Sequence, residues 1–140
     1  MLVIDANIAV KFVAAEPGQD EAFARVASEE SLISPDWVLI EVGHALWRKV
    51  RENEIDRAMA EESLKALPTL FETLTGSAKV IELAQALSFE LDHWLYDCLY
   101  LATAVDRDAT LLTADRKFWN AAKRAGYAAR VELLTWPGKT

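Results

Sequence analysis

The chain has 140 residues, 52% of them hydrophobic and 26% charged, and its 22 acidic and 15 basic side chains give a net charge of −7. This length and apolar content suit one domain with a single core and exclude a disordered protein. The one cysteine, Cys98, excludes a disulfide framework and a multi-cysteine zinc site, and it suits a reducing compartment. The acidic balance is an objection to nucleic-acid binding, because Lys and Arg make most phosphate contacts.

Membrane association is not expected from the hydrophobic pattern. The longest stretch without a charged residue, Cys98 to Val105, has eight residues, whereas a membrane-spanning helix needs about 20. The first residues contain no basic segment and no long apolar segment, so we expect no signal peptide. These features predict a cytoplasmic protein.

Hydrophobic periodicity and turn residues predict short strands that alternate with helices. In chain order we expect a strand at 2–4, helices at 8–12 and 20–27, a strand at 32–34, helices at 35–51 and 56–67, a strand at 69–74, helices at 77–89 and 93–105, a strand at 109–113, a helix at 115–125 and a strand at 130–134. Short apolar strands between helices are typical of a parallel sheet covered on both faces. The sequence therefore predicts a single α/β domain over residues 1–140.

The helix expected at 35–51 has the most distinctive local signals. Ser34 is expected to cap it, and Pro35 is expected at its first helical position. Residues 37–47 are apolar almost all round, which predicts burial on several sides. Five aromatic side chains are expected in the core: Trp37, Trp47, Trp94, Tyr96 and Tyr100.

Two acidic residues lie among apolar residues within predicted helices. At helical spacing, the neighbours of Asp97 are His93, Trp94, Tyr100 and Leu101, none of them Lys or Arg. The neighbours of Glu41 at that spacing are likewise mostly apolar. Because an unpaired buried carboxylate is costly, both acids need a partner from elsewhere in the fold or a metal ion.

Two further acids, Asp5 and Asp115, follow predicted strands. In an open parallel sheet the carboxyl ends of strands line the crevice where ligands bind, so the four acids are expected to converge there. Four carboxylates within ~5 Å would repel by ~3 kcal/mol per pair at an effective dielectric of ~20, which requires protons or a cation. Oxygen ligands without a cysteine set favour Mg²⁺ or Mn²⁺ over zinc. Such ions would also weaken the objection to nucleic-acid binding.

Each of these acids also has an ordinary structural explanation. Asp5 and Asp115 suit helix N-caps, and Glu41 suits an ion pair with Arg48 or with a distant lysine. The two histidines, His44 and His93, are expected to pack or to orient ligands rather than to bind metal. Asn7 and Thr113 are placed to orient water at a metal, and both also suit turns.

Four segments, in this order, resemble the PIN-domain ribonucleases, and among them the VapC-type toxins of bacterial toxin–antitoxin pairs. They are Val3-Ile-Asp-Ala-Asn7, Ser34-Pro-Asp-Trp-Val-Leu-Ile-Glu-Val-Gly-His-Ala-Leu-Trp47, Tyr96-Asp-Cys-Leu-Tyr-Leu-Ala102 and Leu112-Thr-Ala-Asp-Arg-Lys-Phe118. The resemblance covers essentially the whole chain. It implies a five-stranded parallel sheet of order 3-2-1-4-5 with helices on both faces.

The resemblance also implies an activity and a set of site residues. The acidic quartet of the family falls on Asp5, Glu41, Asp97 and Asp115. The implied reaction is hydrolysis of RNA phosphodiester bonds by an endoribonuclease, in which one or two Mg²⁺ or Mn²⁺ ions polarise the scissile phosphate and supply a hydroxide. The three aspartates are expected to be direct or water-mediated ligands, and Glu41 a ligand or water-orienting base. Asn7 and Thr113 are expected to support them.

Partners follow from the same resemblance. Phosphate contacts are expected from six basic residues: Lys11, Arg48, Lys49, Arg51, Arg116 and Lys117. The family resemblance implies a homodimer and a small VapB-type antitoxin, whose C-terminal segment occupies the acidic groove.

Two other classes of protein remain as alternatives. Glu41-x-x-His44 and Glu90-x-x-His93 match the ligand spacing of di-iron helix bundles, although the predicted strands count against a bundle. The second alternative is a non-catalytic or receiver-like module that binds Mg²⁺ at its strand ends. A receiver would need paired acids after the first strand, and Asp5-Ala-Asn7 offers only one.

Overall fold

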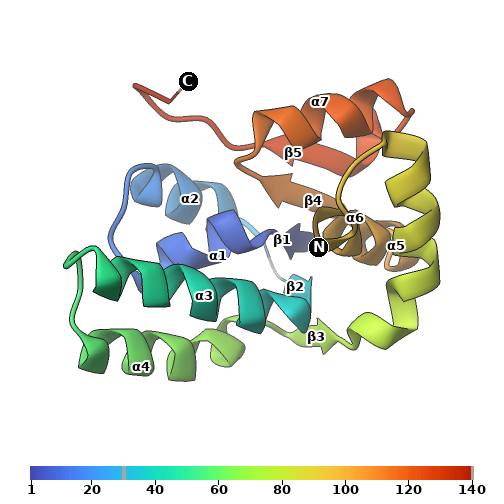
Figure 1. Ribbon diagram of the computed structural model, residues 1–140. Helices are drawn as coiled ribbons and strands as arrows, with labels where there is room; N and C mark the ends of the chain where they lie inside the picture. The colour runs from blue at the N-terminus through green and yellow to red at the C-terminus, as the bar shows by residue number, and fades with distance from the viewer. Residues whose placement is uncertain (30, 140) are drawn as a thin grey trace.

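A computed structural model describes residues 1–29 and 31–139 as a five-stranded parallel sheet of order β3-β2-β1-β4-β5 (Figure 1). The strands are β1 (Leu2–Ile4), β2 (Leu32–Pro35), β3 (Thr73–Thr75), β4 (Thr110–Thr113) and β5 (Val131–Leu133). All four strand pairings are parallel. The predicted fold class and strand order are therefore confirmed.

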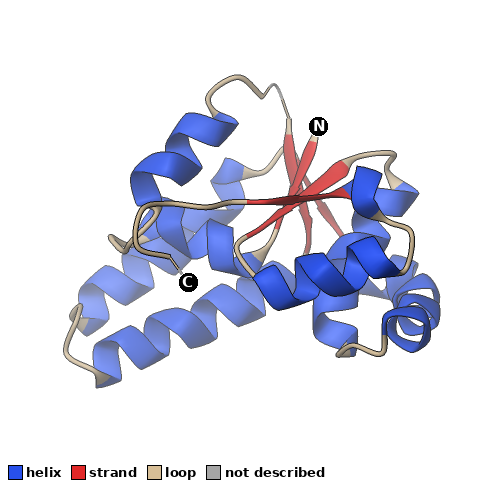
Figure 2. Cartoon of the chain, turned by 90° about the horizontal axis from the view of Figure 1, so that it is seen from above, coloured by secondary structure: helices blue, strands red, loops and turns tan. Residues whose placement is uncertain are grey.

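Seven α-helices of the described chain cover both faces of this sheet. They are α1 (Ala6–Val13), α2 (Gln19–Val26), α3 (Trp37–Arg51), α4 (Arg57–Ala66), α5 (Ser77–Leu91), α6 (Leu95–Asp106) and α7 (Arg116–Arg124), with 3₁₀ helices η1 (Leu67–Leu70) and η2 (Ala128–Arg130). Right-handed crossovers place α1 to α4 on one face and α5 to α7 on the other, and Figure 2 shows helices on both sides of the strands. None of the helices in the described ranges is long and apolar enough to cross a membrane.

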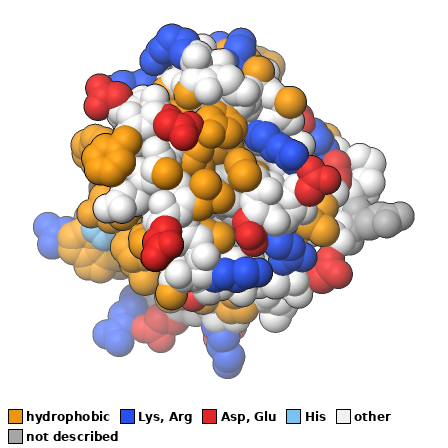
Figure 3. Space-filling view, turned by 90° about the vertical axis from the view of Figure 1, so that its right-hand side faces the viewer, with side chains coloured by type: hydrophobic (Ala, Val, Ile, Leu, Met, Phe, Trp, Pro, Cys, Tyr) orange, Lys and Arg blue, Asp and Glu red, His pale blue; other side chains and the backbone are white. Residues whose placement is uncertain are grey.

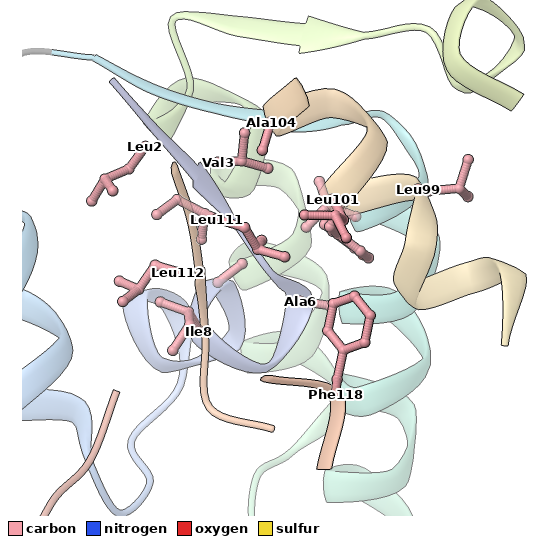
Figure 4. Close-up of a cluster of buried hydrophobic side chains, with 14 of the residues drawn as sticks. Leu2, Val3, Ala6, Ile8, Leu99, Leu101, Ala104, Leu111, Leu112 and Phe118 are labelled. Carbon is pink, nitrogen blue, oxygen red and sulfur yellow. The ribbon is translucent and has the colours of Figure 1, made fainter. Parts of the chain in front are cut away.

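The core lies between the central strands and the helices next to them. β1 is buried at every position, and in α6 the seven consecutive residues Cys98 to Ala104 are buried. Figure 4 shows Leu2 and Val3 of β1 with Leu101 and Ala104 of α6 in one apolar cluster. Because residues 98–104 are held on all sides, the first turn of α6 has a fixed position at the carboxyl edge of the sheet.

The start of α3 differs from the prediction. Ser34 and Pro35 are the last residues of β2, paired with Leu74 and Thr75 of β3, and α3 begins only at Trp37. The Ser34 hydroxyl donates to the carbonyl of Ile4 at 2.8 Å, so it joins two strands instead of capping a helix. Pro35 is tolerated at a strand end because the fixed φ of proline also suits extended backbone.

The third strand is shorter than the predicted segment 69–74. Pro68 lies in the first turn of η1, which includes Thr69 and Leu70, and β3 begins at Thr73. The Thr69 hydroxyl donates to the carbonyl of Ala66 at 2.6 Å, a local bond that favours the helical turn over a strand.

The predicted burial of α3 on several sides is wrong for this chain. Only Val38, Val42 and Leu46, which share one face, are buried, while Ile40 is 58% and Trp47 53% exposed. Three of the five aromatic residues expected in the core are exposed: Trp47, Trp94 and Tyr96. Tyr100 is fully buried as expected, and Trp37 is partly buried. The chain therefore leaves large apolar side chains at its surface.

Candidate active site

The carboxyl edge of the sheet brings together acids from four parts of the chain. Asp5 follows β1 and Asp115 lies two residues after β4, while Glu41 comes from α3 and Asp97 from the first turn of α6. The charges of Asp97 and Glu41 raise the pKa of Asp5, and that of Asp115 raises the pKa of Asp97. The four predicted acids therefore lie close enough to influence one another.

Asp5 is a buried carboxylate that has no cationic partner among residues 1–29 and 31–139. It is 4% exposed, and one carboxylate oxygen accepts a hydrogen bond from the Thr113 hydroxyl at 2.8 Å. Asp5 occupies the N-cap position of α1, but its side chain makes no capping bond. Burial is the main cause of a pKa raised to about 8, and the charges of Asp97 and Glu41 raise it further. Such a group needs a proton or a cation near neutral pH.

Thr113 and Asn7 hold the ends of β1 and β4 together. The Thr113 hydroxyl donates to Asp5 and accepts from the side-chain amide of Asn7 at 3.3 Å and from the backbone amide of Asp115 at 3.1 Å. The side-chain carbonyl oxygen of Asn7 accepts a hydrogen bond from the backbone amide of Ala114 at 2.9 Å. Both residues predicted to orient water thus make bonds that fix the position of Asp5.

Glu41 is held in place by a tyrosine of α6. The hydroxyl of the fully buried Tyr100 donates to a Glu41 carboxylate oxygen at 2.8 Å. Burial is the main cause of the raised pKa of Glu41, with a further contribution from the charge of Asp97. Within residues 1–29 and 31–139, Asp5, Glu41 and Asp115 form no ion pair with Lys or Arg. The alternative in which Glu41 pairs with Arg48 is therefore wrong.

Asp97 has a close partner four residues earlier, just before the start of α6. Nε2 of His93 lies 2.6 Å from the Asp97 carboxylate, and the His93 ring packs against Phe118 with 4.8 Å between ring centroids. Burial raises the pKa of Asp97, and the bond from His93 offsets part of this rise. Asp115 completes the set, because His93, Asp97 and Asp115 each offer one ligand atom within 4.8 Å of the others.

Asp115 combines a structural bond with its place in the cluster. One of its carboxylate oxygens accepts from the backbone amide of Phe118 at 3.1 Å and caps α7. The N-cap explanation therefore holds for Asp115 and fails for Asp5. Because this bond fixes the Asp115 carboxylate, Asp115 faces His93 and Asp97 in a defined orientation.

A groove of about 530 Å³ leads away from two of these acids. Glu41, Asp115 and Asn7 lie in its wall, together with the basic side chains of Lys11, Arg48, Lys49 and Lys139. Trp136 closes one side, packed against Gly18, where a Cβ atom would lie only 2.5 Å from the indole ring. The left-handed backbone of Gly18 also favours glycine at this position.

The six basic residues predicted to contact phosphate occupy different environments. Lys11 is buried, donates to Glu16 at 2.8 Å and to the carbonyl of Pro17 at 2.7 Å, and shares Glu16 with Lys49. Glu16 therefore offsets part of the charge of Lys11 and Lys49, and Glu54 also pairs with Lys49 at 3.3 Å. The other four are exposed or near the surface: Arg48, Arg51, Arg116 and Lys117.

The sequence does not predict the contacts that four residues make at this site. His93 is expected there to pack or to orient ligands, although its i,i+4 spacing to Asp97 is visible in the sequence. The pattern around Tyr100 indicates a core position alone, and the segment near Trp136 and Lys139 carries no signal for the groove. Contacts such as that of Tyr100 with Glu41 join residues 59 apart and depend on tertiary packing.

A sequence profile described as the PIN domain matches residues 2–124. The chain belongs to the PIN domain family. Proteins named Ribonuclease VapC1 from two strains of Mycobacterium tuberculosis are 33% identical to this PIN domain over 133 residues, which are 94% of this chain and 96% of theirs. Ribonuclease VapC3 of Pyrobaculum aerophilum is 29% identical over 118 residues, 83% of this chain and 90% of its own. The resemblance to VapC-type proteins is confirmed.

A solved structure has the same fold as this PIN domain. The crystal structure of PAE2754 from Pyrobaculum aerophilum superposes with a TM-score of 0.68 and 22% identity, covering 86% of this chain and 83% of that one. At this level of identity the match concerns the fold alone.

The parallel sheet excludes the alternative of a di-iron helix bundle. Glu90, which belongs to the second Glu-x-x-His pair of that alternative, instead accepts a hydrogen bond from the Tyr127 hydroxyl at 2.7 Å.

Proposed function

We propose that this PIN domain is a divalent-metal-dependent endoribonuclease that hydrolyses RNA phosphodiester bonds, as the toxin of a VapBC-type pair. The observation that carries the proposal is the convergence of Asp5, Glu41, Asp97 and Asp115 at one edge of the sheet, with a raised pKa for the first three. The names of its relatives, Ribonuclease VapC1 and VapC3, support the same activity.

The donor atoms of the site fit a hard divalent cation. Asp5 is buried with no basic partner in the part of the chain that the structure describes, and a cation beside it would stabilise its ionised form. Carboxylate oxygens are the ligands that Mg²⁺ and Mn²⁺ prefer. When bound, such an ion supplies Lewis-acid polarisation of the scissile phosphate and activation of water. We therefore assign Asp5, Asp97 and Asp115 as ligands.

The chain supplies orientation and proton acceptance around that ion. Thr113 fixes the carboxylate of Asp5, and the N-cap bond to Phe118 fixes that of Asp115. Glu41 is positioned by Tyr100 as a ligand or as the base that orients the attacking water, and its raised pKa makes it a stronger proton acceptor than an ordinary carboxylate. Rigid carboxylates need little reorganisation during the reaction.

The first expected result is metal-dependent cleavage of RNA. Purified protein should cut a mixed single-stranded RNA in Mg²⁺ or Mn²⁺, and excess EDTA should reduce cleavage to background, because the acids repel the phosphate without a cation. The measurement is gel analysis of end-labelled RNA with matched DNA as a control. Cleavage that persists in EDTA would contradict the proposal, and metal binding without cleavage would favour the alternative of a non-catalytic Mg²⁺-binding module.

The RNA backbone is proposed to follow the groove beside the acids. Arg48 lines that groove and is exposed. Arg116 and Lys117, at the start of α7, are exposed as well. We expect Arg48→Gln and Arg116→Gln each to reduce the slope of log affinity against log salt concentration by about 0.7 for each phosphate that the arginine neutralises. Arg57→Gln is the matched control, because Arg57 is 88% exposed and bonded to Glu61 outside the groove. An unchanged slope would remove the tested arginine from the RNA interface.

We also infer that the protein forms a homodimer and binds a VapB-type antitoxin. A cytoplasmic location is inferred as well, because the proposed RNA substrate is present there. The VapC names of the relatives support the antitoxin. Exposed apolar side chains support protein partners: Phe89 is 78% and Trp94 75% exposed. Figure 3 shows apolar side chains gathered on the side of the molecule that carries α5. A separate, mostly apolar groove, lined by Leu46, Trp47 and Leu64 among others, lies between α3 and α4.

A further inference from the structure

His93 lies where a nitrogen ligand could join the carboxylates of the site. The residue precedes α6, and its Nε2 atom lies 2.6 Å from the Asp97 carboxylate. His93, Asp97 and Asp115 form the one set of three ligand atoms within 4.8 Å of one another among residues 1–29 and 31–139. Adjacent ligands of an octahedral ion with bonds of roughly 2.0–2.1 Å lie about 3 Å apart, so the hydrogen-bonded His93–Asp97 pair would have to separate slightly to share a cation.

The surroundings hold the imidazole ring in this orientation. The ring packs against Phe118, the residue whose backbone amide is bonded to Asp115, and the His93 side chain is only 11% exposed. The backbone amide of His93 donates to the carbonyl of Ser88 at the end of α5. The ring therefore needs little movement to place Nε2 on a cation between the two aspartates.

We propose that Nε2 of His93 is a direct ligand of the divalent ion held by Asp97 and Asp115, and that it makes the site prefer Mn²⁺ to Mg²⁺. The inference rests on the proposed function for the presence of the ion. Mg²⁺ is bound almost entirely by oxygen, whereas Mn²⁺, which also takes oxygen ligands, is a first-row transition ion and accepts an imidazole nitrogen more readily than Mg²⁺ does. Replacing one oxygen by nitrogen therefore costs Mg²⁺ affinity more than Mn²⁺ affinity.

The competing role for His93 is positioning without metal contact. In that role the ring only donates a hydrogen bond to Asp97 and orients that carboxylate. Substitution by glutamine separates the two roles, because a side-chain amide retains a donor for Asp97 and lacks the ring nitrogen. A merely positioning histidine is expected to be replaced by glutamine with little change in Mn²⁺ affinity.

The decisive experiment is electron spin-echo envelope modulation spectroscopy of the Mn²⁺-loaded protein. The chain has two histidines, and His44 is stacked on Trp47 on α3, so a coordinated imidazole nitrogen can be assigned. We expect ¹⁴N modulation in the wild type that changes on ¹⁵N-histidine labelling, disappears in His93→Gln and persists in His44→Gln. The labelled wild type gives this result without any variant.

Metal affinity provides the second measurement. By calorimetry, His93→Gln is expected to weaken Mn²⁺ binding several-fold more than Mg²⁺ binding, whereas loss of a merely positioning bond to Asp97 would weaken the binding of both ions alike. Mn²⁺ that binds without imidazole modulation, or unchanged Mn²⁺ affinity in His93→Gln, would overturn the assignment of His93 and leave the carboxylate site and RNA cleavage in place. Loss of RNA cleavage from the wild type would instead overturn the proposed function.

Discussion

Replacing Asp97 by asparagine is expected to reduce RNA cleavage by about 10²–10³-fold, which is typical for removal of one fixed electrostatic group from an active site. Asp97 is the acid of this site that has two neighbours able to bind a metal, His93 and Asp115, with ligand atoms within 4.8 Å. Asparagine keeps the size of the side chain and an oxygen that can accept from His93, but it removes the negative charge. The same change should raise the melting temperature of the metal-free protein by a few degrees, because repulsion from Asp115 is relieved.

Loss of activity together with a gain in stability distinguishes a functional carboxylate from a structural one. The matched control is Asp106→Asn at the end of the same helix, where Asp106 pairs loosely with Lys79 at 3.5 Å. This control should cleave RNA at the wild-type rate, measured with the same end-labelled RNA in Mn²⁺. An Asp97→Asn protein that cleaves normally, or that is inactive only because it unfolds, would contradict the assignment.

The sequence predicted the strand ends of this site because the signals there are local. Leu2–Ile4 and Thr110–Thr113 are short apolar runs, and each is followed closely by an acid at the sheet edge. The order 3-2-1-4-5 came from family resemblance, since periodicity does not say which strands are neighbours. Glu41 and Asp97 were recognised because acids among apolar helical neighbours are costly.

The errors occurred where tertiary contacts override local preference. Ser34 and Pro35 carry strong helix-start signals, yet the bond from Ser34 to Ile4 and pairing with β3 keep them in a strand. The apolar surface of α3 predicted burial, but Ile40 and Trp47 remain 58% and 53% exposed. A hydrophobic pattern alone does not show whether an apolar helix face packs within the chain or stays at its surface.

Lys11 shows a similar limit at the level of one side chain. A lysine in an amphipathic helix was expected at the surface facing RNA, but it is buried beside Glu16 and under the ring of Trp136 at 4.3 Å. The tryptophan comes from the far end of the chain. Sequence spacing cannot show that a lysine 125 residues away lies against it.

In EDTA, the melting temperature of the protein is expected to fall as the pH rises from about 5.5 to about 8. The pKa of Asp5 is about 8 in the folded protein against an ordinary value of 3.8, and the pKa values of Glu41 and Asp97 are raised as well. In this window the folded state binds more protons than the unfolded state, so stability is present at low pH and is lost as the pH approaches 8. Each pH unit costs at most about 1.4 kcal/mol for one such group, and the total shift should be roughly 5–10 °C.

Asp5→Asn isolates the contribution of this buried carboxyl. An asparagine cannot ionise, so the difference in melting temperature between Asp5→Asn and the wild type should increase with pH, while Asp106→Asn should follow the wild type. Mn²⁺ should counteract the fall in the melting temperature of the wild type, because it binds the ionised carboxylates of the folded state. The rise in melting temperature on adding Mn²⁺ should therefore be largest at about pH 8. Thermal unfolding at several pH values, with EDTA or Mn²⁺, measures both effects. A wild-type melting temperature that rises with pH in EDTA, with Asp5→Asn parallel to it, would mean that Asp5 is already ionised without a cation, and the argument for a metal at this carboxylate would fail.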